Sequence, residues 1–371
     1  MRISSLLIIL TSCRLAISST SSLGPGNGAW RVDTPESHGF DSDAMKRLGY
    51  DPTTFFETEH PPQNTHSHRD HIFKVGVRGC AVVVHNGSIV FERYAYKSYN
   101  TSGHEGFSQT KSIGALVTGY AWSKNQLDLD ADITKTYGVK SPRPYPVTSR
   151  QIMSQAIAGE NGPGESWQYD AVGTRWINHL PAVILNATGR KASEIFDTEF
   201  RVPLGLSKEF KWRDADNVFA AGTVGTCRDY ARFGQLLLNR GRWPGLSENI
   251  VSEEYIDMMR TPQTRYDPYV NYSNPCYGLL TWLNTNPGSD RGSKEYPGVR
   301  KMWPKSTWFP SGSGSNVYLM AGLFGQETMV IPNHNMIVVS MGFSVDDYPL
   351  ERAMYEGVCE LYPDECSKQN N

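Results

Sequence analysis

Strand-forming patterns lie near both ends of this chain, and helix-forming patterns lie between them. Residues 78–96 (RGCAVVVHNGSIVFERYAY) are two apolar runs around an Asn-Gly pair, which predicts a β-hairpin. Strand patterns return over residues 316–343, and residues 349–362 predict a closing amphipathic helix. Residues 113–260 carry apolar residues at helical spacing, in segments that end at glycine. This order predicts one sheet built from both chain ends, beside a helical insertion, with a cleft between them.

The helix that follows the predicted hairpin carries the candidate chemistry. In residues 106–122 (GFSQTKSIGALVTGYAW) an apolar stripe begins after Ser108, and Lys111 lies three residues on, so both side chains share one helical face. Burial and the positive end of the helix dipole should both lower the pKa of a lysine placed there. A neutral Lys111 could accept the hydroxyl proton of Ser108 as the serine attacks a carbonyl carbon. The alternative is a serine N-cap followed by an exposed lysine.

Composition limits the kinds of partner. The chain has 371 residues, of which 39% are hydrophobic and 20% charged, so it can bury a large core as one two-lobed domain or as two domains. The net charge is −2 and no basic run occurs, which argues against a nucleic acid or an anionic membrane surface as partner. The sequence therefore indicates a small or neutral partner.

The first residues have the pattern of an export signal. Arg2 precedes a short apolar core over residues 3–10, and small polar residues follow to residue 22, so we expect a signal peptide over residues 1–18. No later segment reaches the roughly 18 apolar residues of a membrane helix. The sequence therefore predicts a secreted or extracytoplasmic protein.

Two further features bear on the compartment. Sequons for N-glycosylation begin at Asn86, Asn100, Asn186 and Asn271. The alternative is a bacterial lipobox, because Leu10-Thr11-Ser12-Cys13 resembles one, and Cys13 would then carry a lipid anchor.

Cysteine and histidine residues are candidates for disulfide or metal-binding groups. Cys359 and Cys366 are close in the chain and form a plausible disulfide in an oxidising compartment. A histidine-rich tract can hold zinc or copper, but without an HExxH or Cys/His zinc spacing a solvated loop is the favoured interpretation, and no metal or cofactor is expected. The residues of this tract are His60, His66, His68, Asp70 and His71.

Four motifs then occur in an order typical of one family. They are Ser108-Gln-Thr-Lys111-Ser, Pro163-Gly164-Glu-Ser-Trp-Gln-Tyr169, GTCRDYARFG at residues 225–234, and Ala321-Gly322-Leu-Phe-Gly325-Gln326. From about residue 30 to about residue 345 the chain resembles the serine β-lactamase-related superfamily. That group includes penicillin-binding proteins and class C β-lactamases, and the pattern is most similar to family VIII esterases and 6-aminohexanoate-dimer hydrolases. No GxSxG motif, which an α/β-hydrolase would need, is present.

The resemblance implies a fold and a division of the chain. The expected fold is α/β (α+β), β-lactamase/transpeptidase-like, with an antiparallel sheet flanked by helices and a large helical insertion. Residues 30–365 would form the β-lactamase-related domain. Within it, residues 70–112 and 305–365 would form an α/β lobe and residues 113–300 a mainly helical lobe.

The resemblance also implies roles for individual residues. Ser108 would be the nucleophile that forms an acyl-enzyme, and Lys111 would share its proton. Tyr169, with its pKa lowered by the lysine, would relay a proton to the leaving group and then activate water. The amide of Ser108 and a second amide near Gly322 and Leu323 would bind the oxyanion, and Ala321 would lie beside the substrate. The alternative for Tyr169 is a structural tyrosine near a Pro-Gly turn.

Two positions depart from the family pattern. Ala171 stands where the second motif usually has asparagine, so an amide is missing unless Asp170 or Gln168 substitutes. Met320 stands where the third motif usually has lysine or histidine, and a carboxylate substrate would lose a hydrogen bond worth about 1.5 to 3 kcal/mol. We therefore predict a serine hydrolase that acts on an uncharged, small-molecule ester or amide. The alternatives are a catalytically impaired homologue that serves as a binding module and, less favoured, a metal-binding protein of the histidine tract.

Overall fold

The computed structural model describes most of the chain between residues 23 and 341. The described residues are 23–48, 79–94, 100–157, 167–263, 277–284, 316–323, 325–341 and 360–363. The predicted signal segment, the histidine tract, Cys359 with Cys366, and most of the predicted closing helix lie outside them. None of the described helices combines the length and the apolarity needed to cross a membrane.

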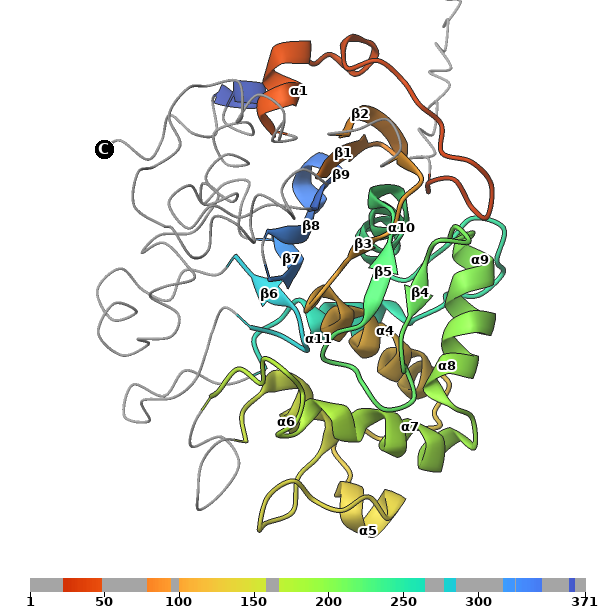
Figure 1. The fold of residues 1–371 in the computed structure, drawn as a ribbon, viewed down its shortest axis with the longest axis vertical. Helices are drawn as coiled ribbons and strands as arrows, with labels where there is room; N and C mark the ends of the chain where they lie inside the picture. Colours follow the sequence, from red (N-terminus) through yellow and green to blue (C-terminus); the bar gives the residue numbers. More distant parts are fainter. Residues whose placement is uncertain are drawn as a thin grey trace, which may run out of the picture.

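The helices and strands in chain order are α1 (Ser42–Leu48), β1 (Cys80–His85), β2 (Ser88–Tyr94), β3 (His104–Glu105), α4 (Gln109–Ser123), α5 (Ile133–Tyr137), α6 (Ser149–Ser154), α7 (Leu180–Thr188), α8 (Ala192–Ile195), α9 (Val202–Leu204), β4 (Lys211–Trp212), β5 (Thr223–Gly225), α10 (Cys227–Leu238), α11 (Glu253–Met259), β6 (Trp282–Leu283), β7 (Tyr318–Gly322), β8 (Gln326–Ile331) and β9 (Met336–Met341). The strands β1 to β3 and β6 to β9 lie toward the two ends of the described chain, and the helices lie mostly between them (Figure 1).

The main sheet confirms that both chain ends contribute strands to one layer. Its six strands run in the order β2-β1-β9-β8-β7-β6, and the pairs between them are antiparallel. β1 and β2 form the predicted hairpin, in which Asn86 and Gly87 both have positive φ, as the favoured two-residue turn requires. β1 also pairs with β9 from Cys80 opposite Met341 to His85 opposite Met336, so the N-terminal hairpin joins the C-terminal strands.

A second, three-stranded sheet was not predicted. Its order is β3-β5-β4, and β3 lies just before α4 in the chain. Strands of two or three residues carry no readable alternation, so the sequence gives no signal for them. This small sheet fixes the chain immediately before Ser108, because His104 pairs with Gly225 and Glu105 with Val224.

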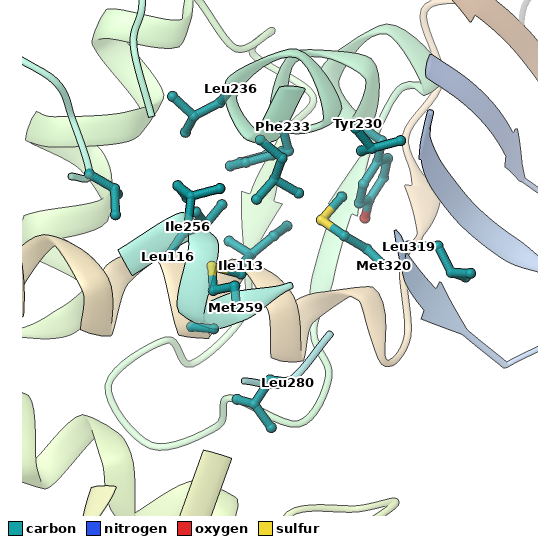
Figure 2. Close-up of a cluster of buried hydrophobic side chains, with 14 of the residues drawn as sticks. Ile113, Leu116, Tyr230, Phe233, Leu236, Ile256, Met259, Leu280, Leu319 and Met320 are labelled. Carbon is teal, nitrogen blue, oxygen red and sulfur yellow. The ribbon is translucent and has the colours of Figure 1, made fainter. Parts of the chain in front are cut away.

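Helix α4 is buried almost all round, rather than along one stripe. It packs against β7 and β8 on one side and against α7 and α11 on the other. Figure 2 shows Ile113 and Leu116 of α4 among side chains of α10 and α11. Gly114 and Gly119 allow aromatic rings to approach, since an added Cβ would lie 2.6 Å from Phe219 and 2.3 Å from Tyr255. A helix enclosed in this way holds its N-terminal residues in a fixed position.

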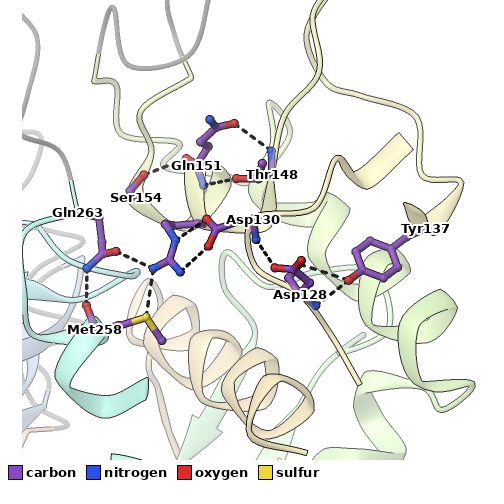
Figure 3. Close-up of polar contacts among 9 residues, drawn as sticks. Asp128, Asp130, Tyr137, Thr148, Gln151, Ser154, Met258 and Gln263 are labelled. Atoms are coloured by element: carbon purple, nitrogen blue, oxygen red, sulfur yellow. Dashed lines mark hydrogen bonds and ion pairs between the residues drawn. The ribbon is translucent and has the colours of Figure 1, made fainter. Parts of the chain in front are cut away.

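Polar contacts fix the region around α6, and Figure 3 shows Asp130, Thr148, Gln151 and Gln263 among the residues that make them. Arg150 donates two hydrogen bonds to the carboxylate of Asp130, at 2.6 and 2.8 Å, and a third to Gln263 at 3.0 Å. The side chain of Thr148 caps α6 in a reciprocal pair with Gln151. α6 is thereby tied to the chain before α5 and to the chain after α11.

Two elements of the predicted helical lobe lie with the main sheet. α10 packs against β9, β8 and β1, and β6 is the edge strand next to β7. Both belong to residues 113–300, so this range contributes an edge strand to the main sheet and a helix that packs on it. The division into two lobes stays a prediction.

Candidate active site

The turn before α4 presents the hydroxyl of Ser108 without using it as a helix cap. Phe107 has φ of +46°, in the left-handed region that non-glycine residues seldom adopt. Ser108 is the N-cap residue, but its side chain makes no capping hydrogen bond. Gly106 donates its N–H to Thr223 at 2.8 Å, and a Cβ at Gly106 would lie 2.2 Å from the hydroxyl of Tyr230. The strained turn is therefore held by β5 and α10.

Lys111 is buried and contacts the serine, as predicted. Its side chain is 1% exposed, and Nζ lies 2.9 Å from Ser108 Oγ. Nζ also lies 2.8 Å from the carbonyl oxygens of Ala171 and Ala220. Burial lowers the pKa of Lys111 to about 7, although the charge of Asp170 acts in the opposite direction. The alternative of an exposed lysine is excluded.

Tyr169 completes a group of three converging side chains. The side chains of Tyr169 and Ser108 are hydrogen-bonded, and Lys111 Nζ lies 5.1 Å from the centroid of the tyrosine ring. The predicted lowering of the Tyr169 pKa is wrong: burial raises this pKa to about 12, the hydrogen bond with Ser108 opposes the shift, and the charge of Asp170 adds to it. A phenolate is therefore costly at this position. Tyr169 is a neutral phenol in this structure.

The end of β7 lies against the turn that carries the serine. A Cβ at Gly322 would lie 2.2 Å from the carbonyl oxygen of Gly106 and 3.2 Å from the amide nitrogen of Ser108. Only glycine permits this approach. Ala321 pairs with Glu327 of β8, and the side chain of Leu323 is 59% exposed. The two amides predicted to bind an oxyanion thus come from adjacent segments.

The missing asparagine of the second motif is replaced by backbone, not by either suggested side chain. The carboxylate of Asp170 accepts hydrogen bonds from the N–H groups of Gly173, Trp176 and Ile177. Gln168 is exposed. Lys111 instead donates to the carbonyl of Ala171, the residue that stands in the place of the asparagine.

The position that usually carries a cation in the third motif is part of the core. Met320 is fully buried, and in Figure 2 its side chain lies with Ile113 and Tyr230. A buried thioether carries no charge and donates no hydrogen bond. No positive charge is available at this point of β7 to bind a carboxylate.

Sequence reasoning missed the residues that support Tyr169. Gln155, buried with φ of +59°, donates to the hydroxyl of Tyr277 at 2.8 Å and accepts from the N–H of Asp170. The rings of Tyr277 and Trp282 lie 6.3 and 5.5 Å from the ring of Tyr169. These contacts join segments far apart in the chain, so no local pattern could have indicated them.

Comparison with known proteins identifies the family. A family model described as Beta-lactamase matches residues 69–352. This chain belongs to the beta-lactamase family. The motifs at Ser108, Tyr169 and Gly322 all lie inside the matched range. Comparison with curated proteins finds no match to this member of the beta-lactamase family.

Solved structures with the beta-lactamase fold resemble this chain over most of its length. A protein described as a 6-aminohexanoate-dimer hydrolase from Bacillus anthracis is 17% identical with a TM-score of 0.58, covering 82% of this chain and 84% of that chain. A beta-lactamase from Mycobacterium bovis is 16% identical with a TM-score of 0.56, covering 77% and 95%. EstA from Arthrobacter nitroguajacolicus is 14% identical with a TM-score of 0.54, covering 80% and 97%. At these identities the likeness establishes the fold.

Proposed function

We propose that this member of the beta-lactamase family is a serine hydrolase, and that Ser108 forms an acyl-enzyme with an uncharged ester or amide. The observation that carries the proposal is the set of contacts around Lys111 Nζ. A neutral amine has two N–H donors and one lone pair. The carbonyls of Ala171 and Ala220 can only accept, so they take the two donors. The lone pair is left for the hydroxyl of Ser108, 2.9 Å away.

The reaction then follows from the contacts of the three side chains. Ser108 Oγ attacks the carbonyl carbon while its proton passes to Lys111. The developing oxyanion lies against the backbone amides of Ser108 and of the residue after Gly322. Tyr169 gives its proton to the leaving group and is reprotonated by Lys111, which suits a phenol that stays neutral until that moment. In the second half, water attacks the acyl carbonyl carbon and its proton passes to Lys111. The bond between the acyl group and Ser108 Oγ then breaks, and Oγ takes a proton back from Lys111.

The surroundings favour an uncharged substrate. Met320 supplies no cation, and Lys111 has a pKa of about 7 and is directed at the serine. Two large apolar side chains next to site residues are exposed: Val172, which follows Ala171, and Leu323, which follows Gly322. Exposed apolar side chains at a site can contact the apolar part of a ligand.

The same proposal includes an extracytoplasmic location. A disulfide joins Cys80 and Cys227, and structural disulfides are typical of oxidising compartments. The sequon residues Asn86, Asn100 and Asn186 are exposed, as glycosylation requires, whereas Asn271 lies outside the described residues.

The test uses a neutral ester and a matched ester with a carboxylate on its acyl group. We expect p-nitrophenyl butyrate to give a burst of p-nitrophenol and a butyryl adduct on Ser108 by intact mass and peptide mapping. The hemiglutarate ester should react with a kcat/KM lower by about 10-fold or more, because its carboxylate finds no cation at Met320. Folded protein that shows no burst and no labelling of Ser108 by a fluorophosphonate would contradict the enzyme proposal and favour the binding module.

The close approach of β7 predicts a large effect of one methyl group. Gly322→Ala should lower kcat/KM for p-nitrophenyl butyrate by about 10²-fold or more, because the new Cβ must push β7 away from the turn at Gly106 and separate the two oxyanion amides. Gly138→Ala is the control: it also replaces a glycine, with φ of +66° and no atom within 4 Å of the added Cβ, and should cost stability alone. Full activity in Gly322→Ala would show that this strand edge takes no part in the reaction.

A further inference from the structure

The two carbonyl groups that hold Lys111 come from separate segments, and each segment has its own support. Ala171 lies 60 positions from Lys111 in the chain and Ala220 lies 109 positions from it. A shift of either carbonyl would free a donor of the amine and turn its lone pair away from Ser108. The side chains that fix the two carbonyls therefore bear on the reaction without touching a substrate.

Asp170 organises the segment of Ala171. Its carboxylate accepts the N–H of Gly173 at 3.0 Å, of Trp176 at 2.9 Å and of Ile177 at 3.1 Å, and its side chain is 1% exposed. A buried carboxylate is costly unless hydrogen bonds compensate for the lost water. These three bonds close the turn that begins at Asp170, so the carbonyl of Ala171 is held in place from the preceding residue.

Asn178 joins that turn to the segment of Ala220. Its Oδ1 accepts the N–H of Phe219 at 3.0 Å and of Ala220 at 3.3 Å, while its backbone N–H donates to the carbonyl of Gly173 at 3.2 Å. The packing there is close: a Cβ at Gly173 would lie 2.4 Å from Asn178 Oδ1 and 2.5 Å from Ala220 Cβ. The backbone and the side chain of this one residue thus set the spacing between the two segments that contact Lys111.

We propose that Asp170 and Asn178 are positioning residues for Lys111: Asn178 fixes the spacing of the two carbonyls, and Asp170 fixes the turn of Ala171. This inference rests on the proposed function, because it assigns a role in activating Ser108. It also explains how Lys111 can be positioned although residue 171 is alanine and not asparagine. The carbonyl of Ala171, held by the side chains of Asp170 and Asn178, accepts a hydrogen bond from Lys111 in place of a side-chain amide.

Asp170 is well placed to be the charge that acts on Lys111. The titratable residues of the turn over residues 169–177 are Tyr169, Asp170 and the exposed Arg175. The charge of Asp170 raises the pKa of Lys111 against the effect of burial. On α7, which packs against α4, no side chain titrates. On β8, Thr328 faces α4, so Glu327 lies on the other face of the strand. The remaining acidic residues on elements around α4 are paired or exposed: Glu105 with Arg213, Glu253 and Asp257 with Arg240, and exposed Glu254.

The test is the pH profile of kcat/KM for p-nitrophenyl butyrate, together with the pH dependence of fluorophosphonate labelling. Activity needs neutral Lys111, so kcat/KM and the labelling rate should both increase as the pH rises, with a midpoint near the Lys111 pKa of about 7. Asp170→Asn removes the negative charge, and its midpoint should move to lower pH by about one unit. Asn178→Asp keeps the acceptor oxygen but adds a negative charge, and its midpoint should move to higher pH by about half a unit or more.

Asn178→Ala separates geometry from charge. Loss of Oδ1 should lower kcat by about 10-fold or more with KM changed by less than about 3-fold, since the base is displaced while substrate contacts remain. Asn178→Asp should restore kcat at pH values above its raised midpoint. Asp229→Asn is the matched control, because Asp229 is another buried carboxylate that accepts backbone N–H groups, at the N-terminus of α10. That variant should lose thermal stability without moving the midpoint.

Unmoved midpoints in folded Asp170→Asn and Asn178→Asp, with an active wild type, would overturn the inference and leave the proposed function standing. If Asp170→Asn does not fold, the upward shift in Asn178→Asp decides alone. A wild-type protein that neither turns over the ester nor labels at Ser108 would overturn both proposals.

Discussion

Ser108→Ala is expected to lower ester hydrolysis by more than about 10³-fold and to abolish fluorophosphonate labelling, while leaving the thermal unfolding midpoint close to that of the wild type. The reason for the unchanged stability is the geometry of the helix start. Ser108 occupies the N-cap position, but its hydroxyl makes no capping bond and instead contacts Lys111 and Tyr169. Removing it deletes the nucleophile and no helix cap.

Ser112→Ala, one turn further along α4, is the matched control with the opposite outcome. Ser112 is buried, and its hydroxyl donates to the carbonyl of Leu280 at 2.6 Å. Its loss leaves that carbonyl unpaired, so the free energy of unfolding should fall by about 1 to 3 kcal/mol while kcat/KM stays near the wild-type value. Substantial hydrolysis by Ser108→Ala in a preparation free of wild type would remove Ser108 from the role of nucleophile.

The features that the sequence predicted well are those with a local physical signal. The Asn86-Gly87 turn between two apolar runs specifies a hairpin, which the structure confirms. The contact between Ser108 and Lys111 follows from a spacing of three residues on one helix. In each case the residues that interact are neighbours in the chain.

The features that the sequence could not predict depend on segments that meet only in the fold. Asn178 acts by joining Gly173 to Phe219 and Ala220, and nothing in its own surroundings in the sequence distinguishes it. A nearby lysine predicts a lowered pKa for Tyr169, whereas the burial of the phenol raises it. Charge contacts can be inferred from motifs, but desolvation requires the packed structure.

The cysteines illustrate the same limit. Sequence proximity favoured Cys359 with Cys366, a pair that lies outside the described residues. The disulfide in the structure joins Cys80 to Cys227 across 147 positions. Cys80 begins β1 and Cys227 begins α10, and the two meet because α10 packs against the sheet. Only the topology brings them together.

Reduction of this disulfide is expected to lower the free energy of unfolding by about 5 kcal/mol at 25 °C if chain entropy dominates, because the bond closes a loop of nearly 150 residues in the unfolded chain. Both sulfur-bearing side chains are fully buried, so the reduced thiols should stay packed, with the loss arising mainly in the unfolded state. The measurement is the denaturant midpoint of the wild type with and without reductant, with thiol content verified by mass. Cys80→Ala/Cys227→Ala is the control: its midpoint should be low and insensitive to reductant. An unchanged midpoint in wild type with both thiols verified as free would mean that the bond contributes little, and that the packing of α10 on β1 and β9 alone holds the two ends of this loop together.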